Sequence, residues 1–249
     1  MIKIKNDKEI SLMAKSGRIA ALVLEKAVEL AKPGTTTLEI EEAVEEEISK
    51  LGGESAFKKV KGYHYATCFS VNDEVVHGLP SGYVLKNGDI LGIDLGATYQ
   101  GYFSDTATTV IVGGVSEKTT RRFLEVGKET LAKAIKEAHI GKKIGDISAT
   151  IQENIEASGY SVVRELTGHG IGTYLHEEPP VPGVGKRNTG PELKEGMVIA
   201  IEVIYNMGKP RVSILDDGWT IVTSDGSLSG LFEHSIAVTK SGPVVLTKV

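Results

Sequence analysis

Three acidic residues interrupt segments of the sequence that otherwise favour buried β-strands. They are Asp94 in Ile93–Gly96, Asp105 in Ser104–Thr106 and Glu202 in Ala200–Ile204. A carboxylate is costly to bury unless a cation or hydrogen-bond donors lie beside it. Considered one at a time, the two aspartates fit a turn or a helix cap better than a site. Glu202 fits a structural and a chemical role equally well.

Two further motifs supply a histidine and a fourth carboxylate. His169 is enclosed by glycines in the segment Gly168–Gly172, and Glu233 precedes His234 and Ser235. The glycines allow the backbone or a ligand to approach His169 closely. Four carboxylates and one imidazole cannot share a pocket without compensating positive charge. Two divalent cations would supply that charge, and oxygen donors with one nitrogen suit Mn, Fe, Co or Zn.

The order and spacing of these motifs resemble those of the methionine aminopeptidases along nearly the whole chain. The motifs that carry the resemblance are Ile93-Asp94-Leu95-Gly96, Ser104-Asp105-Thr106, Gly168-His169-Gly170-Ile171-Gly172, His176-Glu177-Glu178-Pro179, Gly196-Met197 through Glu202, and Phe232-Glu233-His234-Ser235. The resemblance implies an α+β pita-bread fold, in which two pseudo-symmetric halves form a curved antiparallel sheet with helices on its outer face. It also implies a type I enzyme, a metal-dependent hydrolase that removes the initiator methionine from nascent proteins and from peptides with a small second residue.

The same resemblance implies roles for individual side chains. Two divalent metal ions would activate the attacking water, and their ligands would be Asp94, Asp105, His169, Glu202 and Glu233. Glu202 would also carry protons, His176 would stabilise the oxyanion, and His77 would contact the scissile amide or the leaving amine. The residues implied around the methionine side chain are Cys68, Trp219, Leu175 and Tyr65.

The chain departs from the family pattern at two places. Val203 follows Glu202 where proline is usual, and Gly62–Thr67 differs from the usual Gly-Phe-Pro-x-Ser. The second segment borders the substrate cleft, so the side-chain preference is harder to infer than metal binding. Two alternatives therefore stay open. One is an Xaa-Pro aminopeptidase of the same fold, and the other is a catalytically inactive module that binds histones, RNA or ribosomes.

The elements that must position these residues come in blocks of helices and blocks of strands. Such blocks favour an α+β arrangement over a doubly wound parallel sheet. Apolar periodicity and capping residues predict helices at Asp7–Leu30, at a segment capped by Thr36 or Thr37, at Glu117–Ala138 and at Ile147–Ala157. Strands are predicted at Thr67–Val71, Ile90–Leu95, Thr106–Val112, Met197–Ile204, Thr220–Thr223 and Ser235–Thr239.

A shift of 107 residues superimposes the two pairs of predicted helices. It places Gly34 on Gly141, Ile40 on Ile147, Val44 on Ile151, Ile48 on Ile155 and Gly52 on Gly159. We interpret the repeat as two related halves, roughly residues 7–110 and 115–240. Both halves would belong to a single catalytic domain that spans residues 1–249.

The composition is typical of a globular protein and argues against several other classes of protein. Hydrophobic residues make up 41% of the chain and charged residues 24%, and the net charge of −5 gives no basis for nucleic-acid binding. No apolar run approaches the roughly 20 residues that span a bilayer, and no signal peptide is recognisable. The single cysteine, Cys68, suits a reducing compartment. We therefore expect a cytoplasmic protein. The resemblance to the methionine aminopeptidases implies a monomer that acts on peptide and nascent-chain N-termini, with transient ribosome association.

Overall fold

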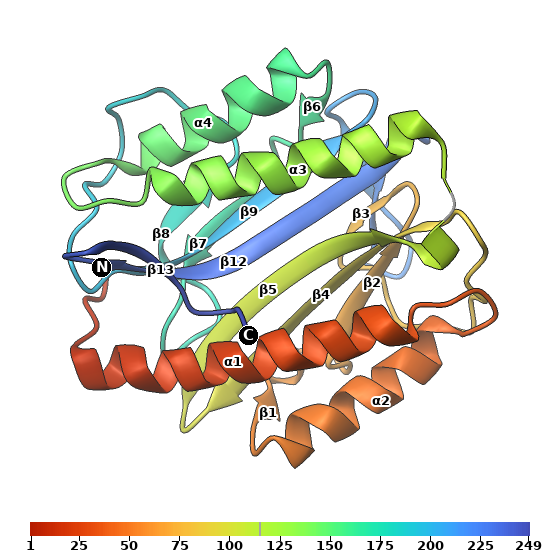
Figure 1. Cartoon of the computed structure of the whole chain (residues 1–249), viewed down its shortest axis with the longest axis horizontal. Helices are drawn as coiled ribbons and strands as arrows, with labels where there is room; N and C mark the ends of the chain where they lie inside the picture. The colour runs from red at the N-terminus through yellow and green to blue at the C-terminus, as the bar shows by residue number, and fades with distance from the viewer. Residues whose placement is uncertain (115) are drawn as a thin grey trace.

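The computed structural model describes residues 1–114 and 116–249, and within them four α-helices cover one face of a curved sheet (Figure 1). The first half contains α1 (Asp7–Leu30), α2 (Thr37–Lys50), β1 (Glu54–Ser55), the 3-10 helix η1 (Phe57–Lys59), β2 (Thr67–Val71), β3 (Glu74–Val76), β4 (Ile90–Tyr99), β5 (Tyr102–Ile111) and η2 (Val112–Gly114). The second half contains α3 (Lys118–Lys136), α4 (Ile144–Ala157), β6 (Ser161–Val162), β7 (Thr167–Gly170), β8 (Glu177–Pro182), β9 (Val198–Asn206), β10 (Val212–Ile214), β11 (Ile221–Thr223), β12 (Ser229–Thr239) and β13 (Gly242–Val245).

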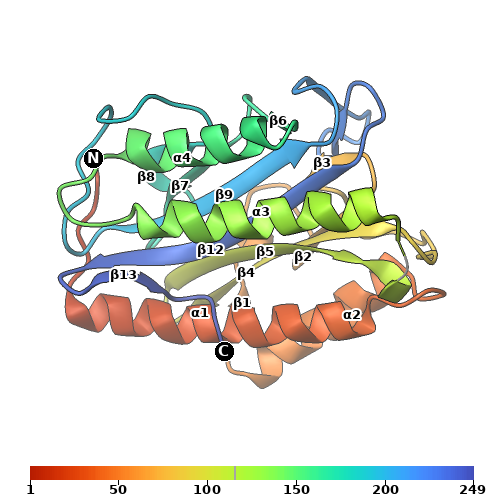
Figure 2. The ribbon, with the colours of Figure 1, turned by 45° about the horizontal axis from the view of Figure 1, so that its top comes forward.

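The described strands form one large antiparallel sheet and one small sheet. The large sheet has the order β1-β4-β5-β12-β9-β7-β8, while β2 pairs with β4, β6 with β9 and β13 with β12. β5 of the first half pairs with β12 of the second, so one sheet runs through both halves (Figure 2). The small sheet joins β10, β11 and β3. The predicted α+β class, with an antiparallel sheet and outer helices, is confirmed.

The two halves repeat one arrangement of helices. α2 and α4 are both 14 residues long, and both of their ends are related by the shift of 107 residues seen in the sequence. Because the halves share one sheet, we propose that residues 1–249 form a single domain. Residue 115, the predicted start of the second half, lies outside the described residues.

Along the central strands, side chains that pack beneath the helices alternate with side chains that point to the opposite face of the sheet. The core of the first half includes Leu91, Ile93 and Leu95 of β4, and that of the second half includes Ile199, Ile201 and Val203 of β9. Successive side chains of a strand point to opposite faces. Asp94 and Glu202 therefore point away from the helices, towards the concave face. Among the described residues, no helix combines the length and apolar character needed to cross a membrane.

Capping boxes fix the starts of the first two helices. Asn6 accepts a hydrogen bond from the Glu9 amide at 3.1 Å, and Glu9 accepts one from the Asn6 amide at 2.8 Å. Thr36 caps α2 in the same way with Glu39. These reciprocal bonds satisfy amides that would otherwise lack partners at a helix start. α1 has the predicted bounds, and of the two predicted caps of α2, Thr36 and Thr37, the structure uses Thr36.

The structure corrects the bounds of several predicted elements. β4 extends to Tyr99, beyond the predicted Leu95, and β5 begins at Tyr102, ahead of the predicted Thr106, so Asp105 lies inside it. α4 begins three residues before the predicted Ile147, because Asp146 accepts a hydrogen bond from the Lys143 amide at 2.8 Å and stabilises a first turn that contains Gly145. The strand predicted from Ser235 begins at Ser229, so Glu233 lies inside it. Strands β7 and β8 were not predicted, since glycine and proline are both rare in strands. β8 lies at the edge of the sheet, where proline is tolerated.

A buried carboxylate of α2 holds the start of β2. Glu41 is 4% exposed, and it accepts hydrogen bonds from the amides of Ala66 and Thr67 and from the Thr67 hydroxyl. Burial raises the pKa of Glu41, and the bonds from Thr67 and Ala66 oppose that rise. Because Cys68 follows directly, Glu41 also fixes one wall of the cavity described below.

Replacing Glu41 with alanine should destabilise the protein strongly. The change leaves two buried amides without an acceptor, so we expect the free energy of unfolding to fall by about 2–4 kcal/mol. Chemical denaturation followed by circular dichroism measures this loss. The control is Glu42→Ala, an exposed glutamate of the same helix, with an expected change within about 0.5 kcal/mol. Equal losses in the two variants would refute the anchoring role.

Candidate metal centre

The five residues predicted to bind metal lie on five strands of the large sheet. Asp94 is on β4, Asp105 on β5, His169 on β7, Glu202 on β9 and Glu233 on β12. The pairing of these strands fixes which of the five residues lie opposite one another. Glu202 lies directly opposite Glu233, and both Asp94 and Glu233 lie opposite Ala107. The central antiparallel strands therefore bring carboxylates from both halves to one place on the concave face.

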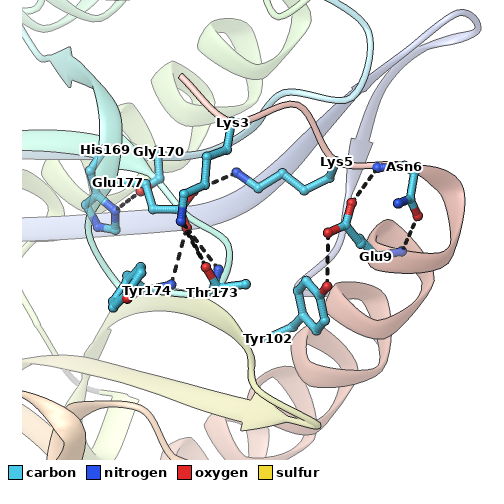
Figure 3. A network of polar contacts seen from close by, with 10 residues as sticks. All are labelled: Lys3, Lys5, Asn6, Glu9, Tyr102, His169, Gly170, Thr173, Tyr174 and Glu177. Atoms are coloured by element: carbon cyan, nitrogen blue, oxygen red, sulfur yellow. Dashed lines mark hydrogen bonds and ion pairs between the residues drawn. The ribbon is translucent and has the colours of Figure 1, made fainter. Parts of the chain in front are cut away.

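His169 turns one ring nitrogen towards the carboxylates. Its Nδ1 lies 2.9 Å from the Gly170 carbonyl oxygen and donates to it (Figure 3). The Nε2 atom then keeps its lone pair free, as a metal-binding histidine requires. It lies 3.7 Å from Asp105 Oδ2 and 3.8 Å from Glu202 Oε1. Ligand atoms of Asp105, His169 and Glu233 all lie within 4.8 Å of one another.

Burial is the main reason that the titration of this cluster is unusual. It raises the pKa of Asp94 to about 7. Burial and then the charges of Asp94 and Glu202 raise the pKa of Asp105 well above its usual range. The pKa values of Glu202 and Glu233 are raised in the same way, first by burial and then by neighbouring carboxylates. Burial, followed by a neighbouring imidazole, lowers the pKa of His169 to about 4, so this ring is neutral at neutral pH.

Three carboxylate oxygens in the cluster lack a hydrogen-bond donor in the described part of the chain. They are Asp94 Oδ1, Asp105 Oδ1 and Glu233 Oε1, and all three are buried. A buried carboxylate oxygen without a partner is strongly disfavoured. Cations would resolve both the missing partners and the mutual repulsion. The donor set of four carboxylates and one neutral imidazole therefore fits divalent metal ions.

The cluster forms the floor of a cavity of about 270 Å³. The residues that line the cavity include Cys68, His77, Leu175, His176 and Trp219, all of which the sequence predicted to contact substrate. The apolar wall is built around Tyr63, whose ring lies 4.9 Å from that of Trp219. The Tyr63 hydroxyl donates to the Thr67 carbonyl oxygen at 2.6 Å and lies 3.1 Å from Cys68 Sγ. Burial raises the pKa of the Cys68 thiol, so the wall is uncharged.

Two histidines reach the cavity from loops. His77 follows β3 with a φ of 59°, and the adjoining Gly78 packs so closely that an added Cβ would lie 2.1 Å from the Phe69 carbonyl oxygen. His176 precedes β8, and its ring centroid lies 4.5 Å from that of His169. Solvent reaches both rings, but the cavity walls desolvate them and lower their pKa values. Both imidazoles are therefore neutral at neutral pH.

One residue that was predicted to bind substrate lies apart from the cavity lining, and several lining residues were not predicted. Tyr65 packs edge-on against Tyr63, with ring centroids 5.9 Å apart, and lies outside the described lining. The lining residues that were not predicted are Phe57, Val60, Tyr63, Val76, Ile204, Leu231 and the segment Glu165–Thr167. Ile204 and Leu231 were recoverable, since each lies two positions from a predicted ligand and shares its face of the strand. Phe57 and Val60 come from a 3-10 turn with no local signal.

Comparisons with known proteins agree with this geometry. The family model described as metallopeptidase family M24 matches residues 11–240. The methionine aminopeptidase of Clostridium perfringens is 45% identical over 249 residues, which is 100% of both chains. Methionine aminopeptidase 1 of Bacillus subtilis is also 45% identical, again over 100% of both chains.

Solved structures give the same relationship. The crystal structure of methionine aminopeptidase from Thermotoga maritima has a TM-score of 0.98 and 45% identity, with 100% of both chains covered. The prolidase of Pyrococcus furiosus has a TM-score of 0.81 and 27% identity, and this chain covers 65% of that longer protein. The shared pita-bread fold therefore extends to proline-specific peptidases, while the full-length matches are to methionine aminopeptidases. The chain belongs to metallopeptidase family M24, among its methionine aminopeptidases.

Proposed function

We propose that this protein removes the N-terminal methionine from peptides and newly made proteins whose second residue is small, in a metal-dependent hydrolysis. The observation that carries the proposal is the cluster of four carboxylates and one neutral imidazole at the floor of an apolar cavity. The partnerless buried oxygens of Asp94, Asp105 and Glu233 support cation binding there. Full-length relatives named methionine aminopeptidase support the substrate.

The five cluster residues would hold two divalent ions of Co, Mn, Fe or Zn. Bound there, the ions would supply Lewis acidity that lowers the pKa of a water and polarises the scissile carbonyl. The acidic floor attracts the positively charged α-amino group of a substrate, which favours free N-termini. The methionine side chain would lie against Cys68, Tyr63 and Trp219, where an apolar and polarizable surface suits a thioether.

The protein's own side chains would handle protons and developing charge. Glu202 is partly exposed to the cavity, so its carboxylate would accept a proton from the attacking water and pass it to the leaving amine. His176 would donate to the carbonyl oxygen as negative charge develops on it. His77 would contact the scissile amide or the leaving amine from the opposite loop.

The direct test is hydrolysis of Met-Ala-Ser by metal-stripped protein. We expect no release of methionine without metal and restored release when Mn, Fe, Co or Zn is added back singly. Cleavage of Xaa-Pro peptides in place of Met-Ala-Ser would support the proline-specific alternative. A folded protein that cleaves neither peptide with any metal would contradict the proposal.

Two substitutions in the cluster test the residue roles. Glu202→Gln removes the proton acceptor and His169→Ala removes a ligand, so each should lower kcat by about 10³-fold or more. Circular dichroism should show native folding in both. The matched control is His139→Ala, an exposed histidine outside the cavity, which should keep the wild-type rate. Wild-type turnover by either folded cluster variant would contradict the assignment.

The cluster also predicts how the stability of the metal-free protein depends on pH. The folded-state pKa of Asp94 is raised from about 3.8 to about 7, so between these two pH values the folded protein holds more protons than the unfolded chain. The stability gained by protonation is therefore lost as the pH rises through about 7. The Tm of metal-free protein should fall between about pH 7 and 8.5, a window that lies above the ordinary histidine pKa of about 6.5.

Melting curves with and without saturating Mn²⁺ check this prediction. Added metal should raise the Tm more at the higher pH, because the ligands must be deprotonated to bind it. Asp94→Asn should flatten the pH dependence of the metal-free protein. A metal-free Tm that does not change across the window would show that these carboxylates do not titrate as proposed.

We also propose that the protein is a cytoplasmic monomer that meets nascent chains near the ribosome. The support is indirect and comes from the substrate, since a methionine at the N-terminus of a new chain is available as soon as that chain emerges. Light scattering tests the monomer, and sedimentation with purified ribosomes tests the association.

A further inference from the structure

The residues before α1 lie against the turn that contains Thr173 and Tyr174 (Figure 3). We refer to Lys3–Asn6 as the N-terminal arm and to Ile171–His176 as the histidine turn. The backbone of the arm is fixed by a hydrogen bond from the Lys5 amide to the Gly196 carbonyl oxygen at 2.7 Å. Its far end is the helix cap formed by Asn6 and Glu9. Glu9 also accepts a hydrogen bond from the Tyr102 hydroxyl at 3.0 Å, which ties the cap to β5.

A buried ion pair joins the arm to the first residue of β8. Lys5 Nζ lies 2.9 Å from Glu177 Oε2, and the two side chains are only 5% and 4% exposed. Removing one partner of a buried pair leaves an uncompensated charge. Lys3 Nζ also reaches Glu177, at 3.2 Å from Oε1, but the Lys3 side chain is 50% exposed. The two lysines therefore contact one carboxylate under very different solvation.

The Glu177 carboxylate in turn closes the histidine turn. Its Oε1 accepts hydrogen bonds from the Thr173 amide at 2.9 Å and the Tyr174 amide at 3.3 Å. The Lys5 and Lys3 ammonium groups outweigh burial and keep the pKa of Glu177 below its usual value. Glu177 is therefore a charged acceptor that holds the backbone just before His176.

The contact between the arm and the turn leaves no spare room. A Cβ added at Gly172 would lie 2.5 Å from Lys5 Cε and 2.9 Å from both Glu177 carboxylate oxygens. The Gly172 carbonyl oxygen also accepts a hydrogen bond from the Phe103 amide at 2.8 Å. The turn is thus enclosed between β5 on one side and the Lys5–Glu177 pair on the other.

We propose that Lys5 is a positioning residue for the reaction, which acts through Glu177 to hold His176 in place over the metal centre. The inference rests on the proposed function, because His176 is the group assigned to the carbonyl oxygen. Lys5 itself lies outside the cavity lining and contacts no substrate. An oxyanion donor acts mainly in the transition state, so its displacement lowers kcat more than it changes KM.

The first experiment compares Lys5→Met with Lys3→Met in hydrolysis of Met-Ala-Ser by the metal-loaded protein. Methionine keeps the length of lysine and removes its charge. Lys5→Met should lower kcat by about tenfold and leave KM within about twofold, since a small misplacement of a reacting group costs a large factor in rate. Lys3→Met removes the solvated partner of the same carboxylate, and both of its constants should stay within about twofold of wild type.

The second experiment repeats Lys5→Met in a His176→Ala background. If Lys5 acts through His176, the loss caused by Lys5→Met should shrink from about tenfold to less than about twofold, because coupled residues are not additive. A full tenfold loss in that background would show a general structural defect and overturn the positioning role. Unchanged kcat for Lys5→Met in the native background would overturn it as well.

A third measurement is independent of turnover. Hydrogen exchange in the peptide that contains Thr173 and Tyr174 should accelerate in Lys5→Met and not in Lys3→Met, because the Glu177 carboxylate that accepts from both amides loses its buried partner. Unaltered exchange would refute the link between the arm and the turn.

The double variant Lys5→Met/Glu177→Gln is used if Lys5→Met alone does not fold. It leaves no unpaired charge buried, and it replaces Lys5→Met in all three comparisons. Absence of turnover in the wild type would count against the proposed function, while the exchange result would still decide the structural link.

Discussion

The mutual repulsion of four carboxylates on the concave face is the constraint on which the rest of the structure depends. Three of these side chains, Asp94, Glu202 and Glu233, interrupt strands whose alternate residues are apolar and packed beneath helices. The apolar packing on the helix side therefore holds the strands in register, and the register holds the carboxylates together against their repulsion. Burial raises the pKa of Asp94, and burial followed by the charges of Asp94 and Glu202 raises the pKa of Asp105, so both pKa values reflect the cost of holding these carboxylates together. Without a cation, the same packing that builds the site also destabilises it.

The large sheet and the loops around it contribute different things. The sheet supplies the cluster, because its ladders fix which residues face one another across β4, β5, β12 and β9. Much of the cavity wall comes from elements outside those ladders, among them η1 and the loops of the small sheet that contain His77 and Trp219. Relatives with the same sheet can therefore differ in side-chain preference, as the likeness to a prolidase at 27% identity illustrates.

The sequence was sufficient to predict the fold class, the starts of the first two helices and the cluster of five residues. Periodicity identified α1 because its apolar residues repeat over 24 residues, and the capping residues are local signals. The glycine-rich strand β7 and the proline-containing strand β8 were missed, since their strand conformation depends on neighbours distant in the sequence. The position of Tyr65 outside the lining and the contact of Lys5 with Glu177 could not be predicted either. Both depend on how separate loops pack, and no spacing in the sequence records that.

The place of β12 in the sheet has a consequence for biosynthesis. β12 lies between β5 and β9, yet it is made after both of them. While the chain emerges from the ribosome, β5 and β9 each keep one long edge without a partner, and such edges invite pairing with other chains. Insertion of β12 closes both edges and delivers Glu233 in the same step. Completion of the sheet and completion of the metal-binding set are therefore one late folding event, and the nascent protein is most prone to aggregation just before it.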